Sequence, residues 1–151
     1  MHTRLQLAVV ALFMALALPV CAAGLDSRVD QQSIDALTIR ANQAQPREQC
    51  FLYAELVHQM TEFSLRLFAA GEAEKAGKVL KETQQFATKI HLSLAGDDKR
   101  LKNAEILLRH TAFRLKEMLH SSSAEERPLV EETLAQVNQV QTDAMMKVFR
   151  K

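Results

Sequence analysis

Residues that interrupt helices recur at a constant spacing along this chain. Pro46, Gly71, Gly96 and the run Ser121-Ser122-Ser123 follow one another at intervals of 25 residues. Proline is tolerated in the first turn of a helix, and glycine is favoured just past a helix end. The spacing predicts four matched helices, each about 35 Å long at 1.5 Å per residue. They cover residues 46–70, 72–95, 97–120 and 124–149.

Each predicted helix carries apolar or small residues at helical spacing along one face, as expected for an element with one buried side. In the second helix this face is formed by Ala76, Leu80, Thr83, Ala87, Ile90 and Leu94. No segment shows sustained alternation with a period of two, so no sheet is predicted. We therefore predict an all-α fold, an up-down antiparallel four-helix bundle over residues 46–151.

The segment before the bundle, residues 24–45, is thinner in apolar residues. Ile34, Leu37, Ala41 and Ala44 still have helical spacing, and Ser33 is a candidate N-terminal cap. We predict a mobile N-terminus followed by a short additional helix.

Residues 1–23 have the pattern of a secretory signal peptide. Arg4 precedes an apolar run from Leu5 to Leu18, and small residues surround a favoured cleavage site after Ala23. The sequence therefore predicts a periplasmic or secreted protein with no integral membrane segment after cleavage. Two alternatives remain open: a leader that is retained, and a lipid anchor at Cys21. Val20 argues against the lipid anchor, because the residue before a lipidated cysteine is normally small.

Cleavage after Ala23 would leave 128 of the 151 residues, with 18 basic and 18 acidic side chains. A neutral chain gives no reason to expect nucleic acid as a partner. Cys50 would be the remaining cysteine, so no internal disulfide is expected. Three roles are open for it: a buried small residue, an intermolecular disulfide, or a reactive thiol near a helix N-terminus.

A doubled E-x-x-H pattern is the strongest hint of metal chemistry, formed by Glu55 with His58 and by Glu117 with His120. Ferritin-like bundles build di-metal sites from such pairs. On a helical projection, however, His58 and Glu117 each lie about 170° from the centre of their own apolar face. In a simple bundle His58 and His120 are also separated by about 18 Å along the axis. We therefore predict solvated side chains, no shared metal site and no cofactor.

Several other residues are candidates for the core. Thr83 and Gln141 are polar positions within apolar faces, and could fix register, bond to the backbone or line a small cleft. Gly77 interrupts a helical pattern, and either costs about 1 kcal/mol relative to alanine or permits close helix packing. Core packing, rather than copper binding, is expected for the methionines Met60, Met118, Met145 and Met146.

The chain contains no nucleotide-binding loop, no nucleophile elbow and no recognisable catalytic set of residues. The leading hypothesis is a non-enzymatic interaction or scaffold protein of the cell envelope, whose partner is another protein or a second copy. A ligand- or metal-sensing periplasmic bundle is the alternative. A thiol-dependent enzyme or redox protein using Cys50 is the third hypothesis.

Overall fold

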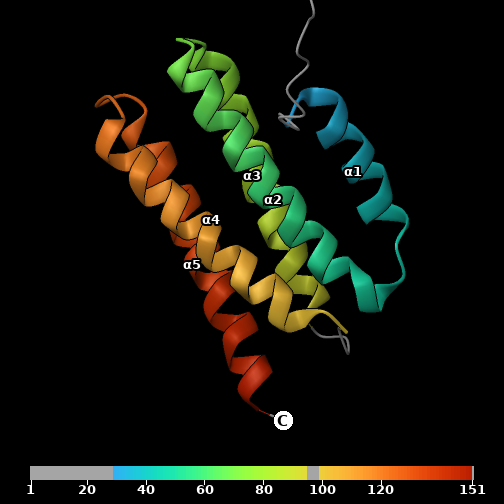
Figure 1. The fold of residues 1–151 in the computed structure, drawn as a ribbon. Helices are drawn as coiled ribbons and strands as arrows, with labels where there is room; N and C mark the ends of the chain where they lie inside the picture. Colours follow the sequence, from blue (N-terminus) through green and yellow to red (C-terminus); the bar gives the residue numbers. More distant parts are fainter. Residues whose placement is uncertain (1–28, 95–98, 151) are drawn as a thin grey trace, which may run out of the picture.

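The computed structural model describes residues 29–94 and 99–150. These residues form five helices and no strand, which confirms the predicted all-helical class (Figure 1). The predicted signal peptide, its Cys21 and the break at Gly96 lie outside the described residues. The helices are α1 (Gln31–Gln43), α2 (Pro46–Ala69), α3 (Ala73–Ser93), α4 (Leu101–Ser121) and α5 (Arg127–Phe149).

The four long helices form a bundle whose packing order differs from their order in the chain. α2 packs against α3 and α4, and α5 packs against the same two helices, whereas α3 and α4 are not in contact. The contacts establish a helical bundle, but not the predicted up-down order in which each long helix packs on the next.

Cross-helix contacts give the relative directions of α2 and its neighbours. His58 and Glu62 of α2 meet residues 111 and 114 of α4, so these two helices run parallel. Ser64 Oγ donates to the carbonyl of Ala76 at 3.1 Å, and the rings of Tyr53 and Phe86 stack with centroids 6.1 Å apart. The second pair of contacts shows that α2 and α3 are antiparallel.

α2 is the most enclosed helix, because α1 covers a side that the other long helices leave open (Figure 1). α1 contributes Ile34, Leu37 and Ala41 to the core. Consequently α2 is buried over a much wider arc than its predicted apolar stripe. Its buried apolar residues are Cys50, Leu52, Tyr53, Ala54, Leu56, Val57 and Met60.

Polar contacts fix α1 at both ends. At its start Asp30 is the N-cap, and Ser33 completes a reciprocal capping box. The predicted cap at Ser33 was therefore wrong by one turn. Near the end of α1, the Asn42 Oδ1 accepts hydrogen bonds from the Tyr53 hydroxyl at 3.1 Å and from Lys89 Nζ at 3.2 Å. The ammonium of Lys89 also lies over the ring of Phe86, so α1 is tied to both α2 and α3.

The predicted core faces agree closely with the observed burial. All six residues predicted for the buried face of α3 are buried, and Met60 and Met118 are also in the core. Met145 and Met146 were predicted to pack in the core as well, but their side chains are exposed. Both lie on the last two turns of α5 but off its buried side, since the adjacent Ala144 is fully buried.

Two glycines differ in whether their backbone conformation requires glycine. Gly71 follows α2 with φ of 77°, and its N–H donates to the carbonyl of Phe68 at 3.0 Å. The N–H of Glu72 donates to the carbonyl of Leu67 at 2.8 Å, which completes a Schellman motif. Gly77 instead lies within α3, where a Cβ atom would sit 3.5 Å from Leu129 Cδ2, an ordinary contact distance.

Alanine substitution at these two glycines should therefore shift stability in opposite directions. Gly77→Ala should raise the free energy of unfolding by about 1 kcal/mol, because it removes backbone freedom from the unfolded chain without a clash. Gly71→Ala should lower it by about 1 kcal/mol, because L-residues disfavour positive φ. Urea denaturation followed by circular dichroism measures both. Destabilisation by Gly77→Ala would show that α3 and α5 are more tightly packed than described.

Candidate functional site

A groove of about 410 Å³ lies between the parallel helices α2 and α4, and we call it the α2–α4 groove. It combines apolar side chains with two imidazoles and one carboxylate. Its apolar residues are Phe51, Ile106 and Leu107. Its polar residues are Glu55, His58, Gln59, Asn103 and His110.

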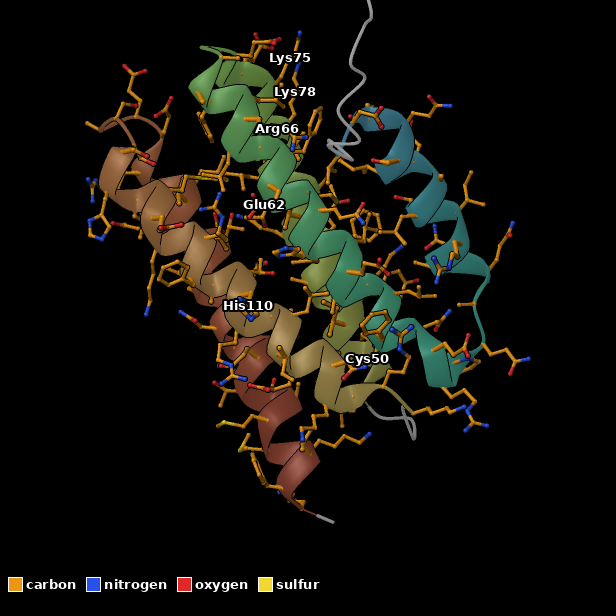
Figure 2. The ribbon with its side chains drawn as sticks, viewed as in Figure 1. Cys50, Glu62, Arg66, Lys75, Lys78 and His110 are labelled. Atoms are coloured by element: carbon orange, nitrogen blue, oxygen red, sulfur yellow. The ribbon has the colours of Figure 1, made fainter. Side chains whose placement is uncertain are left out.

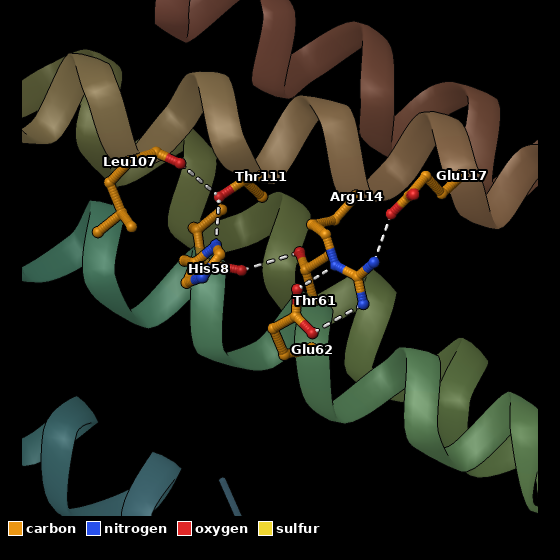
Figure 3. A network of polar contacts seen from close by, with 8 residues as sticks. His58, Thr61, Glu62, Leu107, Thr111, Arg114 and Glu117 are labelled. Carbon is orange, nitrogen blue, oxygen red and sulfur yellow. Dashed lines mark hydrogen bonds and ion pairs between the residues drawn. The ribbon is translucent and has the colours of Figure 1, made fainter.

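His58 is the most constrained polar residue of the groove. Its Nδ1 lies 3.0 Å from Thr111 Oγ1, and that hydroxyl donates its proton to the carbonyl of Leu107 at 2.9 Å (Figure 3). Since a threonine hydroxyl has one proton to donate, its oxygen must accept from His58. The neutral imidazole is therefore protonated at Nδ1 and retains a lone pair at Nε2.

The half-buried position of His58 contradicts the prediction that it faces water. The prediction was based on the angle between His58 and the apolar stripe of α2. That stripe marks only one buried side of the helix. α2 is enclosed by three helices, and the parallel contact with α4 covers the side that carries His58.

Burial lowers the pKa of His58 below its usual 6.5, because a charged imidazole loses hydration there. The carboxylate of Glu62 opposes this shift, while His110 and Arg114 add to it. The groove therefore holds a neutral imidazole at neutral pH.

Arg114 joins α2 and α4 beyond His58. Its Nε donates to Glu62 Oε1 at 2.6 Å and its Nη2 donates to Oε2 at 3.1 Å, in a bidentate pair (Figure 3). Nη1 also pairs with Glu117 on its own helix. These carboxylates raise the pKa of Arg114, so its charge is permanent. The pair fixes the separation of the two helices next to the groove.

The start of α4 is held on α2 at the opposite end of the groove. The N–H of Lys99 donates to the carbonyl of Arg47 at 3.3 Å. The Arg100 guanidinium carbon lies 3.4 Å from the centroid of the Phe51 ring, in a cation–π contact. One face of the Phe51 ring is thus covered by a side chain of the protein itself.

The structure does not bring the two E-x-x-H pairs together. Glu55 and His58 line the groove, while Glu117 is exposed and paired with Arg114, and His120 is exposed at the end of α4. His120 lies nine residues after Thr111, the residue of α4 that contacts His58, which is about 14 Å along the helix. Within residues 29–94 and 99–150, no group of three His, Cys, Asp or Glu side chains could hold a metal ion.

The other candidate residues are engaged within the fold. Cys50 is fully buried near the start of α2 (Figure 2), which fits the role of a small core residue. An intermolecular disulfide or a nucleophile there would require the helix to open. Thr83 Oγ1 donates to the carbonyl of Val79 at 2.8 Å, and Gln141 Nε2 donates to Glu105 Oε1 at 2.9 Å. Both polar positions are thus satisfied locally or across α4 and α5.

A second hollow, of about 510 Å³, lies where α3 and α5 end. His91 Nδ1 pairs with Asp143 Oδ2 at 3.0 Å across these helices. The hollow is also lined by Leu94, Met146, Lys147 and Arg150. Its lining therefore contains apolar side chains and charges of both signs.

Comparison with known proteins gives no family model, no curated protein and no solved structure that matches this chain. Among the helices that the structure describes, none is long and apolar enough to cross a membrane.

Several residues next to the groove were not predicted from the sequence. Thr111, Arg114 and Glu62 act through contacts across more than 50 positions of the chain. No local spacing signals such contacts, because they depend on the parallel pairing of α2 with α4.

The lowered pKa of His58 predicts a specific pH dependence of stability. The unfolded chain binds the proton at a higher pH than the folded chain does. The contribution of the neutral His58 imidazole to the free energy of unfolding is thus fully present above about pH 6.5. It is lost as the pH falls through the pKa of His58 in the folded chain. His58→Asn keeps a donor for Thr111 but does not titrate. Urea unfolding at pH 7.5 and pH 5 should show a smaller loss of stability on acidification for this variant than for the parent.

His120→Asn is the matched control, since His120 is exposed at the end of α4. It should retain the parent's stability loss on acidification. An identical pH dependence for the parent and for His58→Asn would contradict a buried neutral imidazole at this position.

Proposed function

We propose that this chain is an exported, non-enzymatic helical protein that acts as an interaction module in the cell envelope. The pattern of residues 1–23 supports export. The observation that carries the interaction role is an exposed apolar surface at the end of α5, formed by Met145, Met146 and Phe149, which we call the α5 surface.

The α5 surface is apolar where a solvated helix end would be polar. The exposed fractions are 37% for Met145, 42% for Met146 and 80% for Phe149. Residues three and four positions apart are neighbours on a helix, so Phe149 adjoins both methionines. Exposed apolar clusters of this kind mark sites of protein contact, and methionine adapts its shape to a partner.

A second copy of the chain is the partner that these features favour. In a twofold dimer the same surface faces itself, so it must offer both a projection and a recess. Phe149 is the projection, and the second hollow, which Met146 and Leu94 line, is the recess. Asp143 lies in that hollow with Lys147 and Arg150, so the recess carries charges of both signs.

We also infer that the scaffold is a four-helix bundle in which helix directions alternate along the chain. The antiparallel contacts of α2 with α3 and the parallel contacts of α2 with α4 support this arrangement. The chain would then cross the bundle between α3 and α4, rather than join adjacent helices.

A ligand-sensing role is the second candidate, and the α2–α4 groove favours it. The metal-sensing version has no group of ligands to support it among the described residues. The thiol hypothesis gains nothing from the buried position of Cys50.

Phe149→Ser tests the proposed dimer. Light scattering behind a sizing column should give a dimer for the parent and a monomer for the variant, because the substitution removes the projecting ring. Phe113→Ser is the matched control: its ring is 59% exposed on α4, away from the α5 surface, and its loss should leave the dimer intact. Thermal unfolding of both variants should remain cooperative.

The interaction role fails if the parent is monomeric at all concentrations and a photocrosslinker at position 149 captures no protein in cell envelopes. Capture of a different protein by the monomer would overturn the second copy as partner, while keeping the α5 surface as the contact site.

A further inference from the structure

We propose that the α2–α4 groove is a binding site for a small organic cation, a primary ammonium group carried on an apolar body. This site is separate from the α5 surface, and it does not depend on the proposed dimer.

The charge of the groove favours a cation. Glu55 is the carboxylate among its lining residues, and none of the described residues that line it is a lysine or arginine. Two guanidinium groups next to the groove already have partners: Arg100 lies over the Phe51 ring, and Arg114 is paired with Glu62 and Glu117. An anionic ligand would meet Glu55 without a compensating basic residue in the lining.

The hydrogen-bonding groups of the groove favour a ligand that donates hydrogen bonds. Because Thr111 Oγ1 accepts a hydrogen bond from the Nδ1–H of His58, the Nε2 of this neutral imidazole is an acceptor. The carboxylate of Glu55 accepts only, while the amides of Gln59 and Asn103 each offer an acceptor oxygen as well as a donor NH2 group. A primary ammonium carries three donors and no acceptor, so it complements this set better than an alcohol or a carboxylate does.

Apolar contacts define the rest of the ligand. Ile106 and Leu107 of α4 line the groove opposite α2, with Phe51 at one end. Since Arg100 covers one face of Phe51, a ligand can contact only the other face or the rim of that ring. The groove volume of about 410 Å³ lies within the range of small-molecule sites, and suits an amine with one ring or a branched chain.

A divalent metal is the competing occupant that a glutamate and two histidines suggest. The described side chains, however, offer no group of three ligands that could hold one. His58 also has one nitrogen committed to Thr111. The geometry thus favours an organic cation over a bare metal ion.

The test uses phenethylammonium as the probe, with 2-phenylethanol and phenylacetate as uncharged and anionic controls of similar shape. Nuclear magnetic resonance of the purified, isotope-labelled protein should show saturable shifts for phenethylammonium at groove residues such as His58 and Ile106. The two controls should give no saturable shift at the same concentrations. A zinc titration provides a further comparison, and zinc should not displace the probe.

Glu55→Gln should weaken phenethylammonium binding about tenfold, because it removes the charge that faces the ammonium while retaining shape. Glu82→Gln is the matched control, since Glu82 is exposed on α3 outside the groove, and should bind as the parent does. The proposal is overturned if the alcohol binds as well as the amine, if the shifts map outside the groove, or if Glu55→Gln binds unchanged. Displacement by zinc would likewise favour a metal site instead.

Discussion

The enclosure of α2 is the constraint on which the rest of this structure depends. α2 packs against α1, α3 and α4, and its first half is buried over a wide arc that includes Cys50, Leu52 and Val57. Burial of apolar surface contributes about 25 cal/mol per Å², so a helix covered on several sides contributes strongly to the stability of the bundle. α1 is part of this enclosure, held by Asn42 through the Tyr53 hydroxyl. α1 and α3 cover two sides of α2, and α4 packs against another side.

The parallel pairing of α2 with α4 creates the groove and its chemistry. Parallel neighbours place residues 58 and 62 beside residues 111 and 114, so an imidazole and a carboxylate are brought onto the facing helix. The Arg114–Glu62 pair and the Phe51–Arg100 contact hold the two helices at either end of the open stretch. Between them, the side chains do not fill the interface, and Glu55, His58 and His110 are left lining a hollow.

Local patterns predicted the helices and most of the core, because each helix buries residues at its own period. All six residues predicted for the buried face of α3 are buried. The burial of His58 was not predictable, because the angle of a side chain from its own stripe does not reveal how many helices surround it. Met145 and Met146 are exposed although the adjacent Ala144 is fully buried, so an apolar residue beside a buried stripe need not lie in the core. The groove required the pairing of α2 with α4, which no spacing within either helix encodes.

The most direct test of this account is a measurement of which helices are neighbours. Nuclear Overhauser contacts in the labelled protein should connect the ring of His58 with the side chain of Thr111, and should show no series of contacts along the lengths of α3 and α4. Contacts between α3 and α4, together with the absence of the His58–Thr111 contact, would establish the simple up-down order. That result would remove the α2–α4 groove and contradict the account.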